Sequence, residues 1–354
     1  MPGYTRPEMA RDSLSFVGGQ LGRGGPELEM QVDSALDALA TALAGQGSSL
    51  AEVVKLGVFY RGDAVGDRDH LLAALAGHFP AGRPALSAIP VPSLSEPGSL
   101  VQVDAIASRA AAQRLGDGLF PDVVRAGELI ATSAQTVAAP ATDIVWQSEQ
   151  VMECLRELVG RFGASLDDAT KFNIYYAGTG TAEDWEVAAR IRARYFAEPG
   201  PAATGIPLPV LDPAEALISM EVLALLDEDG SSLERDWSWP EGHWDWPIHL
   251  PYKHGNATGG LAFVGGQVAL TPEAAVIAPD DLEAQTAIAL ENIRRVLAGL
   301  GCSWEEIVKL NVFYVDTGGR PSLPGPAAIT QVGLPYLAYE HMMIEIEAIA
   351  RLET

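Results

Sequence analysis

The chain has 354 residues, of which 48% are hydrophobic and 20% charged, a composition typical of a compact globular protein of two or three domains. Its formal net charge is −24, so we expect no nucleic-acid partner and no anionic membrane partner. No apolar run reaches the length of a membrane span, no signal peptide is recognised, and two cysteines form no disulfide framework, so we expect a cytoplasmic protein.

A block of thirty residues occurs three times along the chain without a gap, beginning at Gln31, Gln147 and Gln285. In each copy, apolar residues recur at helical spacing and predict one amphipathic helix. A glycine follows this helix, where a positive φ would end it, and a β-branched and aromatic stretch then predicts a strand. The glycines are Gly47, Gly163 and Gly301, and the strands read VKLGVFY at 54–60, TKFNIYY at 170–176 and VKLNVFY at 308–314.

The segments around each block repeat as well. A short strand ending in Gln is predicted before each helix, at 14–20, 129–135 and 261–267. A second helix is predicted at about 67–79 and 183–196, whereas Gly and Pro disfavour it at 315–328 in the third copy. Two strands close each copy, and the last of them is predicted at 100–107, 217–224 and 343–350.

An α+β unit with its helices on one side leaves one apolar face of its sheet uncovered. Three such units in one chain can bury these faces against each other. We therefore predict an intramolecular pseudo-trimer with units at 1–112, 113–228 and 229–354, the last including a Trp-rich linker and lacking the second helix.

Three features of each copy are similar to the Rid (YjgF) family of imine and enamine deaminases. These are the strand ending in G-G-Q or S-x-Q, the VKLxVFY strand, and a closing strand such as EIEAIA. The resemblance implies three tandem chorismate-mutase-like units, with a small-molecule cleft at each interface. It implies a monomeric pseudo-trimer or a dimer of it. No glycine-rich phosphate loop is present, and His243, His249 and His254 lack metal-site spacing, so we expect no cofactor and no metal.

The arginine with which the family's deaminases hold the substrate carboxylate is missing from all three copies. The matching positions are Leu86, Ala203 and Ile329. A planar guanidinium binds a carboxylate through two hydrogen bonds, so its loss predicts that simple 2-imino acids are poor substrates. Arg83 and Arg320 lie near these positions in the sequence, but we interpret both as surface charges.

Other positions of the family pattern survive in only some copies. The N-terminal tyrosine matches Tyr252, whereas Tyr4 is one residue out of register and Phe120 replaces it in the second copy. The hydroxyl that precedes the Gln at the end of the first strand remains only as Ser133, and the glutamate of the closing strand remains only as Glu345. The resemblance thus implies catalytic roles for Glu345 and Tyr252. It implies substrate-binding positions at Ser133, Tyr4 and Ile329.

Glu345 and Glu347 alternate with apolar residues and are predicted on one face of the closing strand. A buried carboxyl has a raised pKa and can act as a general acid. The alternative is that both glutamates line the surface or pair with lysines. Lys55, Lys171 and Lys309 recur in every copy, which favours a shared structural role such as an ion pair over a Schiff-base role.

Four tryptophans lie within ten residues of the linker before the third unit: Trp237, Trp239, Trp244 and Trp246. They either pin a long crossover to the surface or form an aromatic wall over the third-unit cleft, with Trp246 as a substrate contact. His254 follows Tyr252 by two residues and is a candidate substrate-binding acid or base, the alternative being a solvated loop histidine.

These features predict a cofactor-independent enzyme that acts on a small organic substrate at an inter-unit cleft. The predicted chemistry is imine or enamine hydrolysis, or a related acid/base elimination or cyclisation. One alternative is a chorismatase-like lyase or hydrolase, because chorismatases are similar in three-unit architecture and use a C-terminal glutamate as acid. Their dicarboxylate substrate calls for basic residues, however, and few are evident here. The other alternative is a non-catalytic small-molecule-binding or scaffold protein with vestigial clefts.

Overall fold

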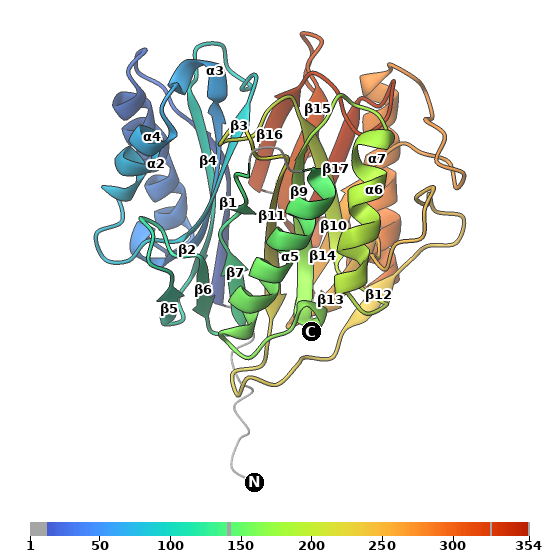
Figure 1. Cartoon of the computed structure of the whole chain (residues 1–354), viewed down its shortest axis with the longest axis horizontal. Helices are drawn as coiled ribbons and strands as arrows, with labels where there is room; N and C mark the ends of the chain where they lie inside the picture. The colour runs from blue at the N-terminus through green and yellow to red at the C-terminus, as the bar shows by residue number, and fades with distance from the viewer. Residues whose placement is uncertain (1–12, 140–142, 326–327, 353–354) are drawn as a thin grey trace.

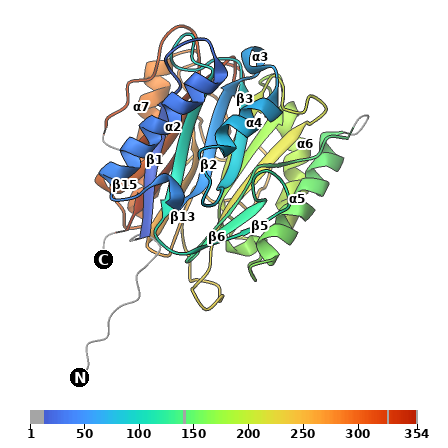
Figure 2. The same cartoon turned by 90° about the vertical axis from the view of Figure 1, so that its left-hand side faces the viewer.

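The computed structural model describes residues 13–139, 143–325 and 328–352, which form three mixed sheets (Figure 1). Each sheet corresponds to one repeat, so the predicted fold of three α+β units in one chain is present. The long helices lie on the outside and the sheets face one another, as the two views show (Figure 2).

The first unit contains a four-stranded sheet in the order β1-β4-β2-β3, in which only β2 and β3 are parallel. The second helix predicted after the long strand is present as α4. The elements are β1 (Leu14–Leu21), α2 (Leu28–Gly45), β2 (Val53–Arg61), α3 (Gly62–Val65), α4 (Arg68–Ala76), β3 (Ala85–Val91) and β4 (Val101–Ser108).

The second unit repeats this order and adds a hairpin of two four-residue strands at the edge of its sheet. These strands were not predicted because they are too short to show a clear alternation of apolar residues. The elements are β5 (Ala112–Leu115), β6 (Val123–Ala126), β7 (Leu129–Thr132), β8 (Gln135–Thr136), α5 (Ile144–Gly160), β9 (Ala169–Ala177), α6 (Glu183–Arg192), β10 (Ala202–Leu208) and β11 (Ile218–Leu225).

The third unit begins within the Trp-rich segment, which contributes two short strands that extend the sheet. Among the described residues between β15 and β16 there is no helix. The elements are β12 (Asp236–Ser238), β13 (Gly255–Thr258), β14 (Leu261–Gln267), α7 (Leu282–Gly299), β15 (Ile307–Val315), β16 (Ala328–Leu334) and β17 (Ile344–Arg351).

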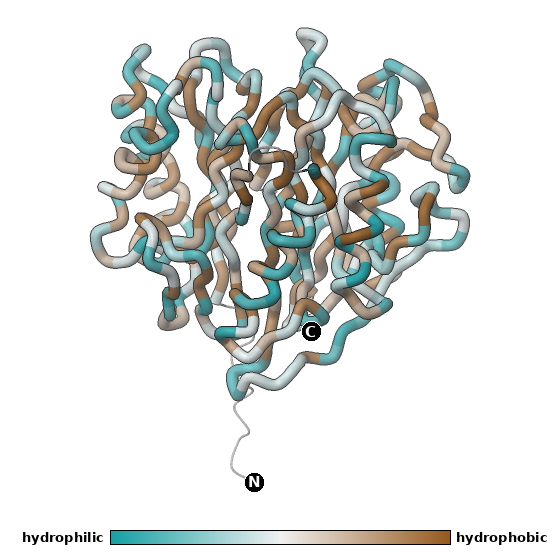
Figure 3. Tube along the Cα trace, viewed as in Figure 1, coloured by the Kyte–Doolittle hydropathy of each residue, from teal (hydrophilic) through white to brown (hydrophobic). Residues whose placement is uncertain are grey.

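The three long helices end as the sequence predicted. Gly47, Gly163 and Gly301 have φ angles of 71°, 84° and 70°, in the left-handed region that a residue without Cβ adopts at little cost. Each helix covers the outer face of its own sheet and forms a separate apolar core with it. Hydrophobic residues accordingly follow the strands and the inner sides of the helices (Figure 3).

The inner faces of the sheets meet around a shared central core. Apolar side chains from all three units form one cluster around Ile106 and Ile349, and another around Phe59, Tyr175 and Phe313. The three rings of the second cluster contact one another edge to face, with centroids 6.0–6.4 Å apart. Burial of these faces supplies the main force that holds the units together.

Three buried ion pairs link the units in a cycle. They join Lys55 to Glu221 at 2.6 Å, Lys171 to Glu347 at 2.8 Å, and Lys309 to Asp104 at 3.0 Å. Each lysine therefore reaches the closing strand of the next unit. The structural role predicted from the recurrence of these lysines is confirmed, and Glu347 belongs to this ring.

Candidate active site between the second and third units

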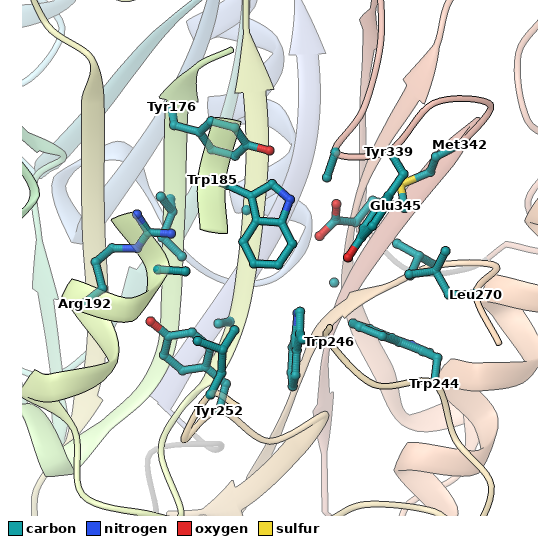
Figure 4. A pocket seen from close by; sticks show the side chains of 18 residues that line it. Tyr176, Trp185, Arg192, Trp244, Trp246, Tyr252, Leu270, Tyr339, Met342 and Glu345 are labelled. Carbon is teal, nitrogen blue, oxygen red and sulfur yellow. The ribbon is translucent and has the colours of Figure 1, made fainter. Parts of the chain in front are cut away.

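A pocket opens at the interface of the second and third units, with an envelope of about 610 Å³ that includes its solvent-open part. The second unit supplies side chains from β9, α6 and β10. The third unit supplies β14, β17 and the Trp-rich segment (Figure 4). Among the predicted site residues, Glu345, Tyr252 and Trp246 come together here.

Glu345 on β17 is the only carboxylate that lines this pocket among the described residues. Burial raises its pKa to about 8, and the neighbouring charge of Glu347 acts in the same direction. Lys171 and a hydrogen bond from the backbone of Gly205 oppose this rise. The carboxyl group is therefore mostly protonated at neutral pH and can donate a proton to a bound molecule.

Two glycines at the end of β14 make room for this arrangement. An added Cβ on Gly266 would collide with the Glu345 carboxyl group, and one on Gly265 would lie 2.6 Å from the carbonyl oxygen of Ala203 in the neighbouring unit. Gly19 and Gly18 are equivalent in β1, where they meet Gln102 and Ile329. In the G-G-Q sequence, the second glycine thus leaves space for a side chain of the closing strand. The first glycine lets two strands of neighbouring units approach closely.

Arg192 is a pocket residue that the sequence analysis missed. It lies at the end of α6, is only 4% exposed, and burial lowers its pKa. Its guanidinium interacts with Tyr252, but Nε and Nη1 have no hydrogen-bond partner among the described residues. A buried guanidinium with free N–H groups is unfavourable unless an acceptor binds there, and a carboxylate is the acceptor that fits its geometry best.

A signal for Arg192 was present in the sequence. Trp185, Ala189 and Arg192 are spaced by four and three residues, so they share the buried face of α6. An arginine on the apolar stripe of a predicted helix is unusual. The sequence analysis instead considered the lost family positions, of which Ala203 also lines the pocket, and the arginines near them in the sequence.

The remaining lining is largely aromatic. Buried polar atoms of Tyr176, Trp185 and Tyr339 have no hydrogen-bond partner among the described residues. Burial raises the pKa values of both hydroxyls, so they stay neutral and can donate or accept hydrogen bonds. Trp244 and Trp246 contact each other with ring centroids 5.0 Å apart and form one wall. The predicted aromatic wall is therefore present, whereas Trp237 and Trp239 are exposed.

His254 lies behind this wall and does not line the pocket. It is 1% exposed, stacks on Trp246 at 5.3 Å, and its Nε2 donates a hydrogen bond of 2.9 Å to the carbonyl oxygen of Trp244. Burial lowers its pKa to about 2, so it remains neutral. The alternative of a solvated loop histidine is wrong, because the tryptophans fold over this residue, and the predicted substrate contact is not available in this pocket either.

Gln267 links the histidines to the wall. Its side-chain oxygen accepts hydrogen bonds from Trp244 Nε1 at 3.2 Å and from His243 Nε2 at 2.8 Å. Its amide donates to His254 Nδ1 at 3.5 Å. In this network both imidazoles carry their proton on Nε2, and Nδ1 of His254 accepts a hydrogen bond. The same network fixes the orientation of Trp244.

The other predicted binding residues lie at different interfaces. Ser133 links the first and second units, because its hydroxyl accepts a 2.7 Å hydrogen bond from the Leu86 backbone and donates to Pro121. Phe120, which replaces the family tyrosine in the second copy, packs into the core of the first unit. Ile329 on β16 faces β1 of the first unit, and Tyr4 lies outside the described residues.

Within the described ranges, no group of three or more His, Cys, Asp or Glu side chains could hold a metal ion. A search of the same residues found no helix with the length and apolar character that crossing a membrane requires.

Sequence relatives match parts of the chain, whereas a solved structure matches nearly all of it. A RutC family protein of Pyrococcus abyssi is 30% identical over 115 residues, 29% of this chain and 87% of the relative. TdcF of Escherichia coli, whose name describes a candidate reactive intermediate deaminase, is 33% identical over 66 residues, 19% of this chain and 50% of the relative. The crystal structure of a chorismatase has a similar fold, with a TM-score of 0.60 at 14% sequence identity, over 95% of this chain and 99% of the other.

The sequence model described as endoribonuclease L-PSP matches residues 2–109 and 247–352, well over half of the chain. Residues 110–246, which include Arg192, lie outside this match. The RutC and TdcF relatives agree with the resemblance drawn from the repeats. The chain belongs to the endoribonuclease L-PSP (Rid) family, with three units fused in one polypeptide.

Proposed function

We propose that the pocket between the second and third units hydrolyses an imine or enamine of a small carboxylate-bearing substrate. The observation that carries this proposal is Glu345, a buried carboxyl group with a pKa of about 8 that opens onto the pocket. The name of the TdcF relative, a candidate reactive intermediate deaminase, supports the reaction class.

In the proposed reaction, Glu345 donates its proton to the imine nitrogen, or to the terminal carbon of an enamine, and the resulting iminium ion is attacked by water. The carbinolamine then releases ammonia or an amine and leaves a carbonyl product, while Glu345 regains a proton. Tyr252 orients the substrate carboxylate together with Arg192. Trp244 and Trp246 shield the reacting atoms from bulk solvent.

Arg192 supplies a basic group to this pocket although the family arginine position is lost. The family arginine position is Ala203, yet a guanidinium enters the same pocket from α6 and offers free N–H groups. A carboxylate-bearing substrate is therefore compatible with the site.

A second candidate is the cleavage of an enol ether, as in a chorismatase-like enzyme. Arg192 favours it, because the sequence analysis found few basic residues near the cleft positions and Arg192 supplies one. The same acid would then protonate the enol-ether carbon, and water would again complete the reaction. The likeness to the chorismatase structure concerns the fold, so it adds no support for this chemistry.

The test is turnover by the wild type and Glu345→Gln, with 2-imino acids generated in situ, neutral imines and enamines, and chorismate. We expect imine or enamine hydrolysis that falls about 10²- to 10⁴-fold in the variant, the range for loss of a general acid. Chorismate turnover with the same dependence would favour the second candidate. No turnover of any compound, with small-molecule binding unchanged by the substitution, would favour a non-catalytic binding protein.

A further inference from the structure

The guanidinium and the carboxyl group that line the pocket enter it from different units. Arg192 comes from α6 of the second unit, and Glu345 comes from β17 of the third. In Figure 4 the guanidinium and the carboxyl group lie on opposite sides of the pocket, with the Trp185 ring between them.

The charges that affect each pKa in the pocket agree with this separation. The charges that shift the pKa of Glu345 are Glu347 and Lys171, whereas the pKa of Tyr176 responds to both Glu345 and Arg192. Tyr176 thus lies within reach of both groups. Its hydroxyl has no hydrogen-bond partner among the described residues, so it is available to a molecule that extends from one group to the other.

Aromatic rings line the space between the two ends. Trp246 contacts Tyr252 on one side at 6.2 Å, and Trp185 contacts Tyr339 on the other at 6.2 Å, in both cases edge to face. Four rings arranged in this way favour a flat, conjugated ligand, because such a group can make offset-stacked or edge contacts with each of them.

We propose that the substrate is planar and conjugated, with a carboxylate bound by Arg192 and a reacting imine or enamine placed at Glu345 by a ring-sized spacer. This inference rests on the proposed function, because it uses Glu345 as the proton donor. In a simple 2-imino acid the carboxylate is bonded to the imine carbon itself. Its two reacting groups are therefore adjacent, whereas Arg192 and Glu345 lie on opposite sides of the pocket, so we expect it to be a poor substrate although an arginine is present.

Binding of stable ketones, which resemble the hydrolysis products, tests this inference without relying on turnover. The probe with the proposed layout is 4-acetylbenzoate. Phenylpyruvate has its carboxylate beside the ketone, acetophenone has no carboxylate, and trans-4-acetylcyclohexane-1-carboxylate has no flat ring. We expect 4-acetylbenzoate to bind at least about tenfold more tightly than each of the others by isothermal titration calorimetry, the effect of one charged or stacking contact.

Variants identify the contacts. Arg192→Gln should weaken 4-acetylbenzoate binding by about 10- to 100-fold, as expected for loss of a charge-assisted hydrogen bond, and should leave acetophenone binding unchanged. Arg190→Gln is the matched control, because Arg190 is exposed on the same helix and should have no effect. Trp246→Leu should reduce the preference for the flat ring over the cyclohexane probe. Circular dichroism and thermal melts verify that each variant is folded.

Three results would overturn the inference: equal affinity for phenylpyruvate and 4-acetylbenzoate, equal affinity for the flat and cyclohexane probes, or unchanged affinity in Arg192→Gln. These results are separate from those that test the proposed function. Hydrolysis of 2-imino acids that depends on Glu345, without selective binding of 4-acetylbenzoate, would reject the spacer and retain the hydrolase. Selective binding of 4-acetylbenzoate without any turnover would retain the spacer and reject the hydrolase.

Discussion

Glu345 and Glu347 lie two residues apart on one face of β17 and both are buried, but only Glu347 has a lysine partner. Lys171 and hydrogen bonds from Asn311 and Thr204 lower the pKa of Glu347 although burial acts in the opposite direction. Among the described residues Glu345 has no lysine partner, and burial raises its pKa so that it keeps its proton at neutral pH. One strand therefore carries a charged structural carboxylate next to a neutral carboxyl group suited to acid chemistry.

The first prediction concerns pH and activity. Because Glu345 must be protonated to act as the acid, kcat/KM should fall tenfold per pH unit as the pH rises through about 8. The measurement is a pH–rate profile of imine hydrolysis at substrate concentrations well below KM. A profile that is flat over roughly pH 6 to pH 9 would rule out Glu345 as the acid.

The same group makes stability depend on pH. Its folded-state pKa of about 8 lies above the ordinary value of 4.5, so the folded state binds the proton more tightly than the unfolded state. The stabilisation from this proton is complete below pH 4.5 and declines as the pH rises through about 8. The free energy of unfolding of Glu345→Gln, measured by urea denaturation, should lack this component of the decline.

The second prediction uses the two equivalent glycines. Gly266→Ala should displace the Glu345 carboxyl group and lower kcat, while Gly19→Ala should displace Gln102 at another interface and leave kcat unchanged. Both should lower the free energy of unfolding by about 1–3 kcal/mol, the usual effect of overpacking. Equal losses of activity in the two variants would mean that the glycine supports the fold alone.

The third prediction separates stability from function at Arg192. Replacing this buried, incompletely hydrogen-bonded cation by methionine should raise the free energy of unfolding by about 1–4 kcal/mol, because its desolvation is no longer required. Binding of carboxylate ligands should be lost at the same time. Arg190→Met on the exposed side of α6 serves as the control, and thermal melts with ligand titrations provide both readouts. A less stable Arg192→Met protein would indicate that Arg192 has a structural role.

The fourth prediction concerns the ion-pair ring. Lys171→Met leaves Glu347 buried without its cation and should lower the free energy of unfolding by about 3–5 kcal/mol. Adding Glu347→Leu should restore most of this loss, because an apolar pair of similar volume removes the unpaired charge. A double-mutant cycle in denaturant measures the coupling. If the double variant is as unstable as Lys171→Met, the loss reflects packing and not the charge.

Much of the fold follows from local patterns. The apolar stripes of α2, α5 and α7 and the β-branched strands that follow them depend on neighbouring residues, so a single sequence is enough to predict them. The repeated lysines likewise indicated a common role, and all three form inter-unit pairs. The short strands β5, β6, β12 and β13 were missed because pairing with a neighbouring strand, not their own sequence, specifies them.

The candidate site was predictable only in part. Three related units were predictable from the repeats, and the family resemblance singled out Glu345 and Tyr252. A cleft position for Trp246 was one of two alternatives for the Trp-rich linker. The entry of Arg192 into this cleft from the second unit, and the enclosure of His254 by tryptophans, became visible only in the three-dimensional fold. The first depends on packing between two units and the second on the folding of a long linker, and no local periodicity specifies such contacts.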